Sequence, residues 1–195
     1  MNELQFTEDW FTLHTPMWVQ HVLPRLTRHP ARFLEIGTFE GRSTCWLLQN
    51  ALTSPHDRIT CIDPFGTYEG CDDSGAPFSY GHYEEVFDAN MRAVEAGARL
   101  DKRKGLSHEV LRTLPLGSYD GCYIDGSHAA RDVLRDAVLC FDLIRVGGFL
   151  LLDDYGFAPK PDQVVAEAID AFLWLYRSDL KLVFKNWQVL VERVQ

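Results

Sequence analysis

The chain has 195 residues, of which 46% are hydrophobic and 24% are charged, and this composition is typical of a globular domain with a sizeable core. The formal net charge is -9, so a nucleic-acid backbone is not an expected partner. The sequence shows neither an apolar run long enough to span a bilayer nor the features of a signal peptide, so we expect a cytoplasmic protein. The five cysteines form no C-x-x-C pair and are expected to be reduced thiols.

Residues 1–30 are rich in aromatic side chains and are predicted to form an N-terminal helical extension. A helix is expected from near Pro16 to Leu26, because proline is well tolerated at the first helical position. The extension either packs beside the domain as a plain helix or covers part of a functional site.

Residues 32–48 read as a buried strand, a glycine turn and the start of a helix. Glu35 lies in the strand, where a carboxylate is costly unless something binds it. Glycines follow where a side chain would block a ligand, and the helix N-terminus attracts anions. The spacing E-x-G-x-x-x-G lacks the third glycine of the dinucleotide fingerprint, and the alternative is an ordinary strand–helix turn. The candidate cofactor-binding residues are Glu35, Gly37, Thr38, Gly41 and Ser43, with the Thr44 hydroxyl beside them.

A second strand is expected over residues 59–62 and ends in Asp63. A carboxylate at the end of this strand suits the two ribose hydroxyls of an adenosine, because it can accept a hydrogen bond from each. The alternative is a simple turn at Asp63–Pro64. Residues 65–83 mix turn-forming and aromatic residues and are predicted to be a lid loop.

The second half of the chain continues the alternation of strands and helices. Helices are predicted over 84–96, after His108, over 130–141 and over 162–176, and strands over 99–104, 119–124 and 149–152. Two final strands, 180–186 and 187–194, are joined by a short connection and form an antiparallel hairpin. The predicted fold class is α/β, a doubly wound seven-stranded sheet that is mostly parallel and has an antiparallel C-terminal hairpin strand.

Three carboxylates follow two strands that should be neighbours: Asp125 after one, and Asp153 and Asp154 after the other. In a doubly wound sheet these strand ends meet on one edge, where unpaired carboxylates would repel one another. A hard divalent cation such as Mg²⁺ removes that conflict. The alternative is that each aspartate caps a helix or starts a turn.

The stretch RFLEIGTFEGRSTCWLL resembles motif I of the Rossmann-like, class I S-adenosylmethionine-dependent methyltransferases, and the order of elements is similar to that family over nearly the whole chain. The resemblance implies that the glycine turn holds the methionine half of the cofactor. It also implies that Ser107 and His108 flank the adenine. The alternative for Ser107 is an N-cap.

The acidic residues resemble those of the metal-dependent O-methyltransferases, the catechol O-methyltransferases and their bacterial small-molecule relatives. That resemblance implies that Asp125, Asp153 and Asp154 bind Mg²⁺ beside the cofactor. It also implies that His128 replaces a lysine as general base; the alternative is a surface histidine. Asp154 stands where the catechol enzymes have an asparagine, which leaves the identity of the metal open.

These observations predict a single methyltransferase domain over residues 1–195 that methylates a hydroxyl of a small molecule with the help of a divalent cation. A metal-independent N- or O-methyltransferase is the first alternative. A nicotinamide-dependent oxidoreductase and a non-catalytic cofactor-binding protein are the others, and a homodimer is left open.

Overall fold

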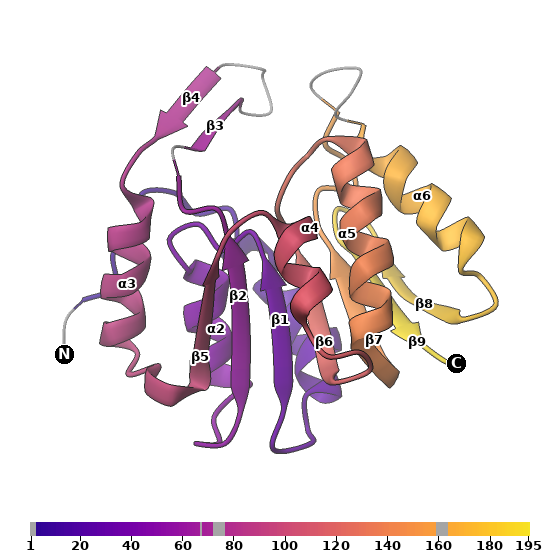
Figure 1. The fold of residues 1–195 in the computed structure, drawn as a ribbon, viewed down its shortest axis with the longest axis horizontal. Coiled ribbons are helices and arrows are strands. Elements are labelled where there is room, and N and C mark those ends of the chain that lie inside the picture. Colours follow the sequence, from indigo (N-terminus) through magenta and orange to yellow (C-terminus); the bar gives the residue numbers. More distant parts are fainter. Residues whose placement is uncertain (1–2, 67, 72–76, 159–163) are drawn as a thin grey trace.

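The structure, a computed structural model, describes residues 3–66, 68–71, 77–158 and 164–195. A seven-stranded sheet runs through its centre in the order β5-β2-β1-β6-β7-β9-β8 (Figure 1). The first five of these strands are parallel, and β9 pairs antiparallel with both β7 and β8. This confirms the predicted doubly wound sheet with an antiparallel C-terminal hairpin. The strands are β1 Arg32–Ile36, β2 Arg58–Asp63, β5 Leu100–Lys104, β6 Tyr119–Ile124, β7 Ile144–Leu152, β8 Leu180–Lys185 and β9 Val189–Arg193.

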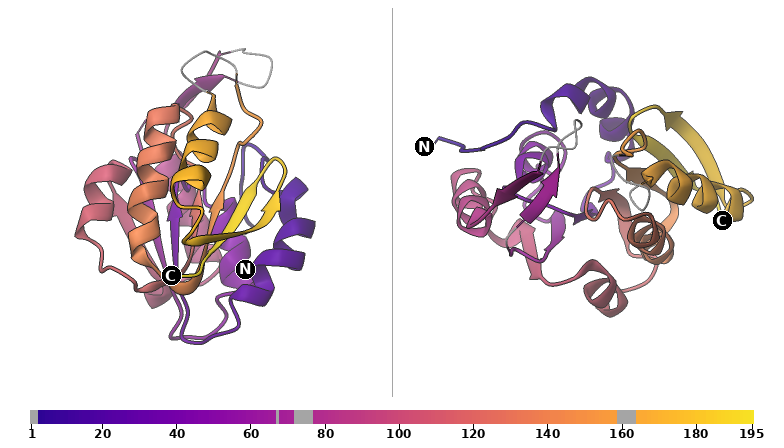
Figure 2. Two further views of the ribbon diagram at one scale, coloured as in Figure 1. Left: turned by 90° about the vertical axis from the view of Figure 1, so that its right-hand side faces the viewer. Right: turned by 90° about the horizontal axis from the view of Figure 1, so that it is seen from above.

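Helices cover both faces of the sheet, as Figure 2 shows from the side and from above. The N-terminal helical segment lies on one face with α2 and α3, and α4, α5 and α6 lie on the other. The N-terminal segment is a succession of short turns, Thr12–His14, Thr15–Met17 (α1), Trp18–Val22 and Leu23–Arg25. The remaining helices are α2 Arg42–Asn50, α3 Tyr83–Ala93, α4 Ser107–Val110, α5 Ala130–Leu143 and α6 Val165–Leu175, with short 3-10 turns at Gly97–Arg99 and Leu111–Thr113. None of the helices in the described ranges is both long and apolar enough to cross a membrane.

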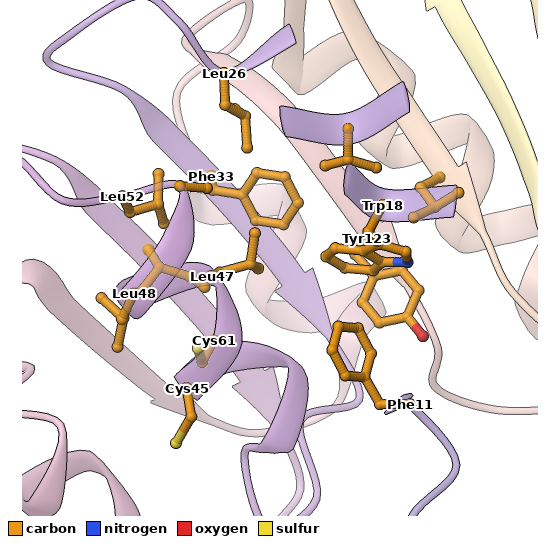
Figure 3. Close-up of a cluster of buried hydrophobic side chains, with 14 of the residues drawn as sticks. Phe11, Trp18, Leu26, Phe33, Cys45, Leu47, Leu48, Leu52, Cys61 and Tyr123 are labelled. Atoms are coloured by element: carbon orange, nitrogen blue, oxygen red, sulfur yellow. The ribbon is translucent and has the colours of Figure 1, made fainter. Parts of the chain in front are cut away.

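Each central strand buries both of its faces, which is why these strands read as unbroken apolar runs. On β1, Phe33 packs in the cluster beneath the N-terminal segment and α2, and its neighbour Leu34 packs in the cluster beneath α5 and α6. Figure 3 shows the first cluster, in which Phe11, Trp18 and Tyr123 lie together. The indole of Trp18 is completely buried and meets the Tyr123 ring edge-on at 4.9 Å between centroids.

The region predicted as a lid loop contains a two-stranded antiparallel sheet, formed by β3 Tyr68–Cys71 and β4 Pro77–Tyr80. The prediction of a loop without strands was therefore wrong for these residues. Each strand has only four residues, too few for an alternating pattern to stand out among turn residues. The hairpin projects beyond the carboxyl ends of β1 and β2 (Figure 1). Its tip, residues 72–76, lies outside the described residues, and closure over the site stays a prediction.

The Gly147–Gly148 pair lies inside β7, which begins at Ile144. The strand predicted over 149–152 therefore begins five residues earlier than expected. The pairing of β6 with β7 shifts between Tyr119 and Gly121, so the glycines form an irregularity within the strand.

Candidate active site

The carboxyl ends of the parallel strands meet at one edge of the sheet. The backbone N–H of Gly37 donates to Ile62 at 2.9 Å, and that of Asp125 donates to Ile36 at 2.9 Å. The N–H of Asp153 donates to Ile124 at 3.0 Å, so the ladder continues past the strands. A cavity of about 1130 Å³ lies at this edge. Of the predicted site residues, those that line it are Gly37, Thr38, Ser43, Asp63, Ser107, Asp125, His128, Asp153 and Asp154.

The glycine turn is required by packing of the protein against itself. Gly37 has a φ of +77°, and a β-carbon there would lie 1.9 Å from the carbonyl oxygen of Asp125. Gly41 has a φ of +80°, and a β-carbon there would lie 2.8 Å from the Phe87 ring. The two glycines let the turn press on the end of β6 and on α3. Packing alone therefore requires glycine at both positions, and the expectation that a side chain here would block a ligand stays a prediction.

Glu35 is completely buried beneath the turn and does not line the cavity. Its carboxylate accepts hydrogen bonds from the hydroxyls of Ser43 and Thr44 in the first turn of α2. Burial raises the pKa of Glu35 to about 7 against the hydroxyl hydrogen bonds, which lower it. The structure thus joins β1 to α2 through Glu35 and does not bring its carboxylate to the cavity, where direct cofactor contact was predicted.

Asp63 lines the cavity and also holds the turn. Its carboxylate accepts hydrogen bonds from the backbone N–H groups of Thr38 at 2.9 Å, Phe39 at 3.1 Å and Phe65 at 2.8 Å, and from the Tyr83 hydroxyl at 2.8 Å. These four donors fill the acceptor positions of a carboxylate. A ribose that bound here would compete most easily with Tyr83, because its hydroxyl is the one donor of the four that is not backbone.

Thr38 has an unused polar group close to the cavity. Its side-chain oxygen is buried and has no hydrogen-bond partner among the described residues. Thr38 also lines the cavity next to Gly37. A buried polar atom without a partner is costly, and a polar ligand would satisfy it. The site therefore fits a cofactor with polar groups at the end of β1.

Ser107 lines the cavity at the start of α4, whereas His108 does not. The N-cap of α4 is Leu106, so the alternative interpretation of Ser107 as an N-cap was wrong. The Ser107 hydroxyl donates to Asp136 of α5 at 2.8 Å. Burial raises the pKa of Asp136 to about 6. The adenine contact predicted for His108 has no support from its position.

The carboxylates at the ends of β6 and β7 do converge. The hydroxyl of Tyr123 lies 2.9 Å from Asp125 Oδ2 and also contacts Asp153 Oδ2. Asp153 further accepts hydrogen bonds from the Gln188 amide at 2.6 Å and from the backbone N–H of Asp154 at 2.7 Å. Burial, followed by repulsion from Asp153, raises the pKa of Asp125 well above its usual range. Burial and the Asp154 charge raise the pKa of Asp153 to about 6.

His128 belongs to the same constellation. Its Nε2 lies 2.8 Å from Asp154 Oδ2, and its ring packs on Phe157 with 4.5 Å between centroids. Asp125, His128 and Asp154 each offer one possible metal-ligand atom, and these atoms lie within 4.8 Å of one another. His128 is therefore partly buried and bonded to a carboxylate, which differs from the alternative of a plain surface histidine, and its role as general base stays a prediction. This set of possible ligands contains His128, whereas the predicted set contained Asp153 as its third member.

The N-terminal segment contributes to the site as well as to the core. Phe6, Trp10 and Phe11 line the cavity. Thr7 donates to both carboxylate oxygens of Glu40, from its N–H at 2.7 Å and from its hydroxyl at 2.8 Å. The extension therefore packs on the domain through Trp18 and lines part of the cavity through residues between 6 and 11. Its helical residues form a succession of short turns, which differs from the plain helix expected from near Pro16 to Leu26.

Sequence reasoning missed three residues of the site: Tyr123, Gln188 and Trp18. The indole N–H of Trp18 donates to Gln188 at 3.0 Å, and Gln188 donates to Asp153. The sequence around Tyr123 and Trp18 predicts ordinary core aromatic residues, and Gln188 lies near the start of the predicted strand over 187–194. Only their polar atoms distinguish them, and periodicity carries no information about where those atoms point.

Comparison with known proteins relates the chain to one family and one fold. A model of the family described as "Methyltransferase domain" matches residues 34–155. The uncharacterized protein R132 of Acanthamoeba polyphaga mimivirus is 27% identical over 144 residues, which cover 69% of this chain and 58% of that protein. The chain therefore spans less than two thirds of that relative's length.

Solved structures with the same fold include three methyltransferases. The O-methyltransferase from Bacillus cereus in complex with S-adenosylhomocysteine has a TM-score of 0.71 and 16% identity, covering 97% of this chain and 84% of its own. TomG from Streptomyces achromogenes, an O-methyltransferase of tomaymycin synthesis in complex with S-adenosylmethionine, has a TM-score of 0.66 and 18% identity, covering 93% and 80%. MycE of the mycinamycin biosynthetic pathway, in complex with Mg and S-adenosylhomocysteine, has a TM-score of 0.63 and 17% identity, covering 96% and 51%.

Proposed function

The chain belongs to the methyltransferase-domain family, and from this premise we propose that it methylates a hydroxyl of a small molecule with S-adenosylmethionine, assisted by a divalent cation. The observation that carries the proposal is the convergence of the Gly37 turn, Asp63 and Asp125 on one cavity. The cofactor supplies the electrophilic methyl group, and the chain supplies position and electrostatics.

The cofactor half of the site lies at the ends of β1, β2 and β5. Thr38 offers its unpaired hydroxyl there, and Asp63 offers a carboxylate toward a ribose. Ser107 lines the same wall at the start of α4 and is the residue proposed to meet the adenine. Glu35 supports this half indirectly, because its carboxylate accepts a hydrogen bond from Ser43 and so holds the first turn of α2.

The acceptor half lies at the ends of β6 and β7. The carboxylates of Asp125, Asp153 and Asp154 gather there, and oxygen ligands are those that Mg²⁺ prefers. A cation held there would lower the pKa of an acceptor hydroxyl. We propose that His128 takes the hydroxyl proton, since Asp154 orients its ring as a carboxylate orients a catalytic imidazole. Similarity to MycE, whose structure contains Mg, is consistent with this arrangement.

A metal-independent methyltransferase is the second candidate, and one observation favours it. His128 Nε2 already lies 2.8 Å from Asp154, so an oriented base exists in the chain without any cation. In this candidate the buried carboxylates only hold the shape of the site.

Calorimetric titration with S-adenosylhomocysteine tests the cofactor, with NADH as the comparison ligand. We expect the protein to bind S-adenosylhomocysteine and not NADH. Binding of NADH without binding of S-adenosylhomocysteine would contradict the proposal and favour an oxidoreductase. A panel of hydroxylated acceptors, including catechols, sugars and natural-product phenols, is then assayed with labelled S-adenosylmethionine. Loss of turnover with a chelator and recovery with Mg²⁺ support the metal-assisted form, whereas unchanged turnover supports the second candidate.

A further inference from the structure

We propose that Asp153 is a positioning residue, and that the divalent cation of the acceptor site is held by Asp125 and Asp154. This inference rests on the metal-assisted form of the proposed function. It gives the three predicted ligands different roles, two in binding the cation and one in positioning. It assigns roles to Tyr123 and Gln188, which no motif identifies.

Asp153 is already bonded to the protein on both of its carboxylate oxygens. Oδ1 accepts the backbone N–H of Asp154 at 2.7 Å. Oδ2 accepts the amide of Gln188 at 2.6 Å and contacts the hydroxyl of Tyr123. The residue is only 7% exposed, although one edge of it reaches the cavity. These three donors leave about one acceptor position of the carboxylate open. Their bonds to an ionised group are among the strong hydrogen bonds of a protein, so they hold Asp153 toward the protein and not toward a cation in the cavity.

The bonds of Asp153 set the positions of the other two carboxylates. The bond from the Asp154 N–H to Oδ1 stabilises a sharp turn in which Asp154 has a φ of +60°, a conformation that aspartate tolerates better than most residues. The carboxylate of Asp154 then points toward His128. On the other side, Tyr123 contacts both Asp153 and Asp125 through one hydroxyl, and so joins the two carboxylates that follow β6 and β7.

Gln188 and Trp18 hold Asp153 from behind. The Gln188 side-chain oxygen accepts the Trp18 indole N–H at 3.0 Å, so its amide NH₂ must face Asp153. Trp18 is completely buried and Gln188 is 1% exposed, so neither group can exchange its partner for solvent. In Figure 3 the indole nitrogen of Trp18 and the phenol oxygen of Tyr123 point to the same side of the cluster. We call the chain Trp18–Gln188–Asp153–Tyr123 the buried network.

Outside the buried network, Asp125 and Asp154 remain to face the cavity, with His128 beside them. Two carboxylates completed by water and substrate oxygens are a common protein contribution to a Mg²⁺ site. His128 keeps its ring for proton transfer in this arrangement. The division also explains why two adjacent aspartates end β7, because one turns inward to the network and the other turns outward to the site.

The first experiment locates the cation directly. Crystals of the protein with S-adenosylhomocysteine are soaked in MnCl₂, and the anomalous signal of Mn²⁺ is measured. We expect the ion within bonding distance of Asp125 and Asp154, with Asp153 still bonded to Gln188. A direct bond from Mn²⁺ to Asp153 overturns the inference but leaves the proposed function intact. Bound S-adenosylhomocysteine without Mn²⁺ overturns the inference and the metal-assisted form together.

The second experiment tests the buried network with a matched pair of variants, Trp18→Phe and Trp46→Phe. The two indoles pack on each other with 5.6 Å between centroids, but only Trp18 donates to Gln188. We expect Trp18→Phe to weaken Mn²⁺ binding by roughly three- to tenfold in electron paramagnetic resonance, because it loosens Asp153 and with it the turn that positions Asp154. The effect should be smaller than the tenfold or more that follows loss of a direct partner of a metal ligand. Trp46→Phe should leave it unchanged. Affinity for S-adenosylhomocysteine should stay the same in both, because neither indole lines the cavity. If the two variants change the affinity for Mn²⁺ equally, Trp18 acts only through packing and the proposed role of the buried network is contradicted.

Discussion

Replacing Glu35 by glutamine should change how the stability of the protein depends on pH. Burial raises the pKa of this carboxyl from 4.5 to about 7. Below pH 4.5 the group is protonated in both the folded and the unfolded chain. As the pH rises toward 7, the unfolded chain ionises while the folded chain keeps its proton, so the free energy of unfolding falls. At about 1.4 kcal/mol for each pH unit, the loss is about 3 kcal/mol by pH 8.

Glu35→Gln removes this ionisation while keeping a side chain that can bond both Ser43 and Thr44. The assay is urea unfolding followed by circular dichroism at pH 5, 6, 7 and 8. The variant should gain about 2.5 kcal/mol relative to the wild type between pH 5 and pH 8, since part of the loss has already occurred at pH 5. Glu109→Gln makes the same change at an exposed side chain and should run parallel to the wild type. If the Glu35→Gln curve is also parallel, burial does not raise the pKa of Glu35 and the account of the turn is wrong.

Three further outcomes are expected. Thr38→Val removes a hydroxyl without a protein partner, so stability should hold while affinity for S-adenosylhomocysteine falls roughly two- to tenfold by calorimetry; Thr60→Val, whose hydroxyl contacts Tyr119, should do the reverse. Asn90→Ala loses two bonds to the Gln5 backbone and one to the Glu40 carbonyl, and should lower the free energy of unfolding by roughly 1.5–4 kcal/mol in urea; a loss near zero would show that the N-terminal segment is not clamped. Asp57→Asn should destabilise the protein at pH 7, because burial of Asp57 is outweighed by hydrogen bonds from Ala31, His29 and Ser54 and the pKa of its carboxyl is lowered. The stability difference between variant and wild type should shrink as the pH falls through that lowered pKa, and thermal melts at pH 3 to 7 that show a constant difference would contradict this.

The sheet could be predicted because its signal is long and its physical cause is local. The parallel strands are buried on both faces, so each is a run of apolar residues that ends at a polar one. Once the strand order is fixed by short connections, the polar ends must meet at one edge. This is why Asp63, Asp125 and Asp153 reach one cavity as expected.

The finer arrangement of the site could not be predicted, because it depends on the direction of single polar atoms. Glu35 and Asp63 are acidic residues near the carboxyl ends of neighbouring strands, yet one is sealed below the turn and the other lines the cavity. Glu35 lies level with Cys61, two residues before Asp63, and the hydroxyls of Ser43 and Thr44 at the start of α2 cover it. The hydrogen bond between Trp18 and Gln188 is even harder to predict from sequence, since the two residues are 170 positions apart.

That separation has a consequence for how the enzyme comes into being. Trp18 leaves the ribosome long before Gln188, its partner at the β8–β9 hairpin. The acidic rim of the cavity therefore takes its final shape only after these two distant segments have met, late in folding, as contacts between distant parts of a chain generally form. A nascent chain that has not yet exposed β9 contains the Gly37 turn but lacks the donor that holds Asp153 from behind.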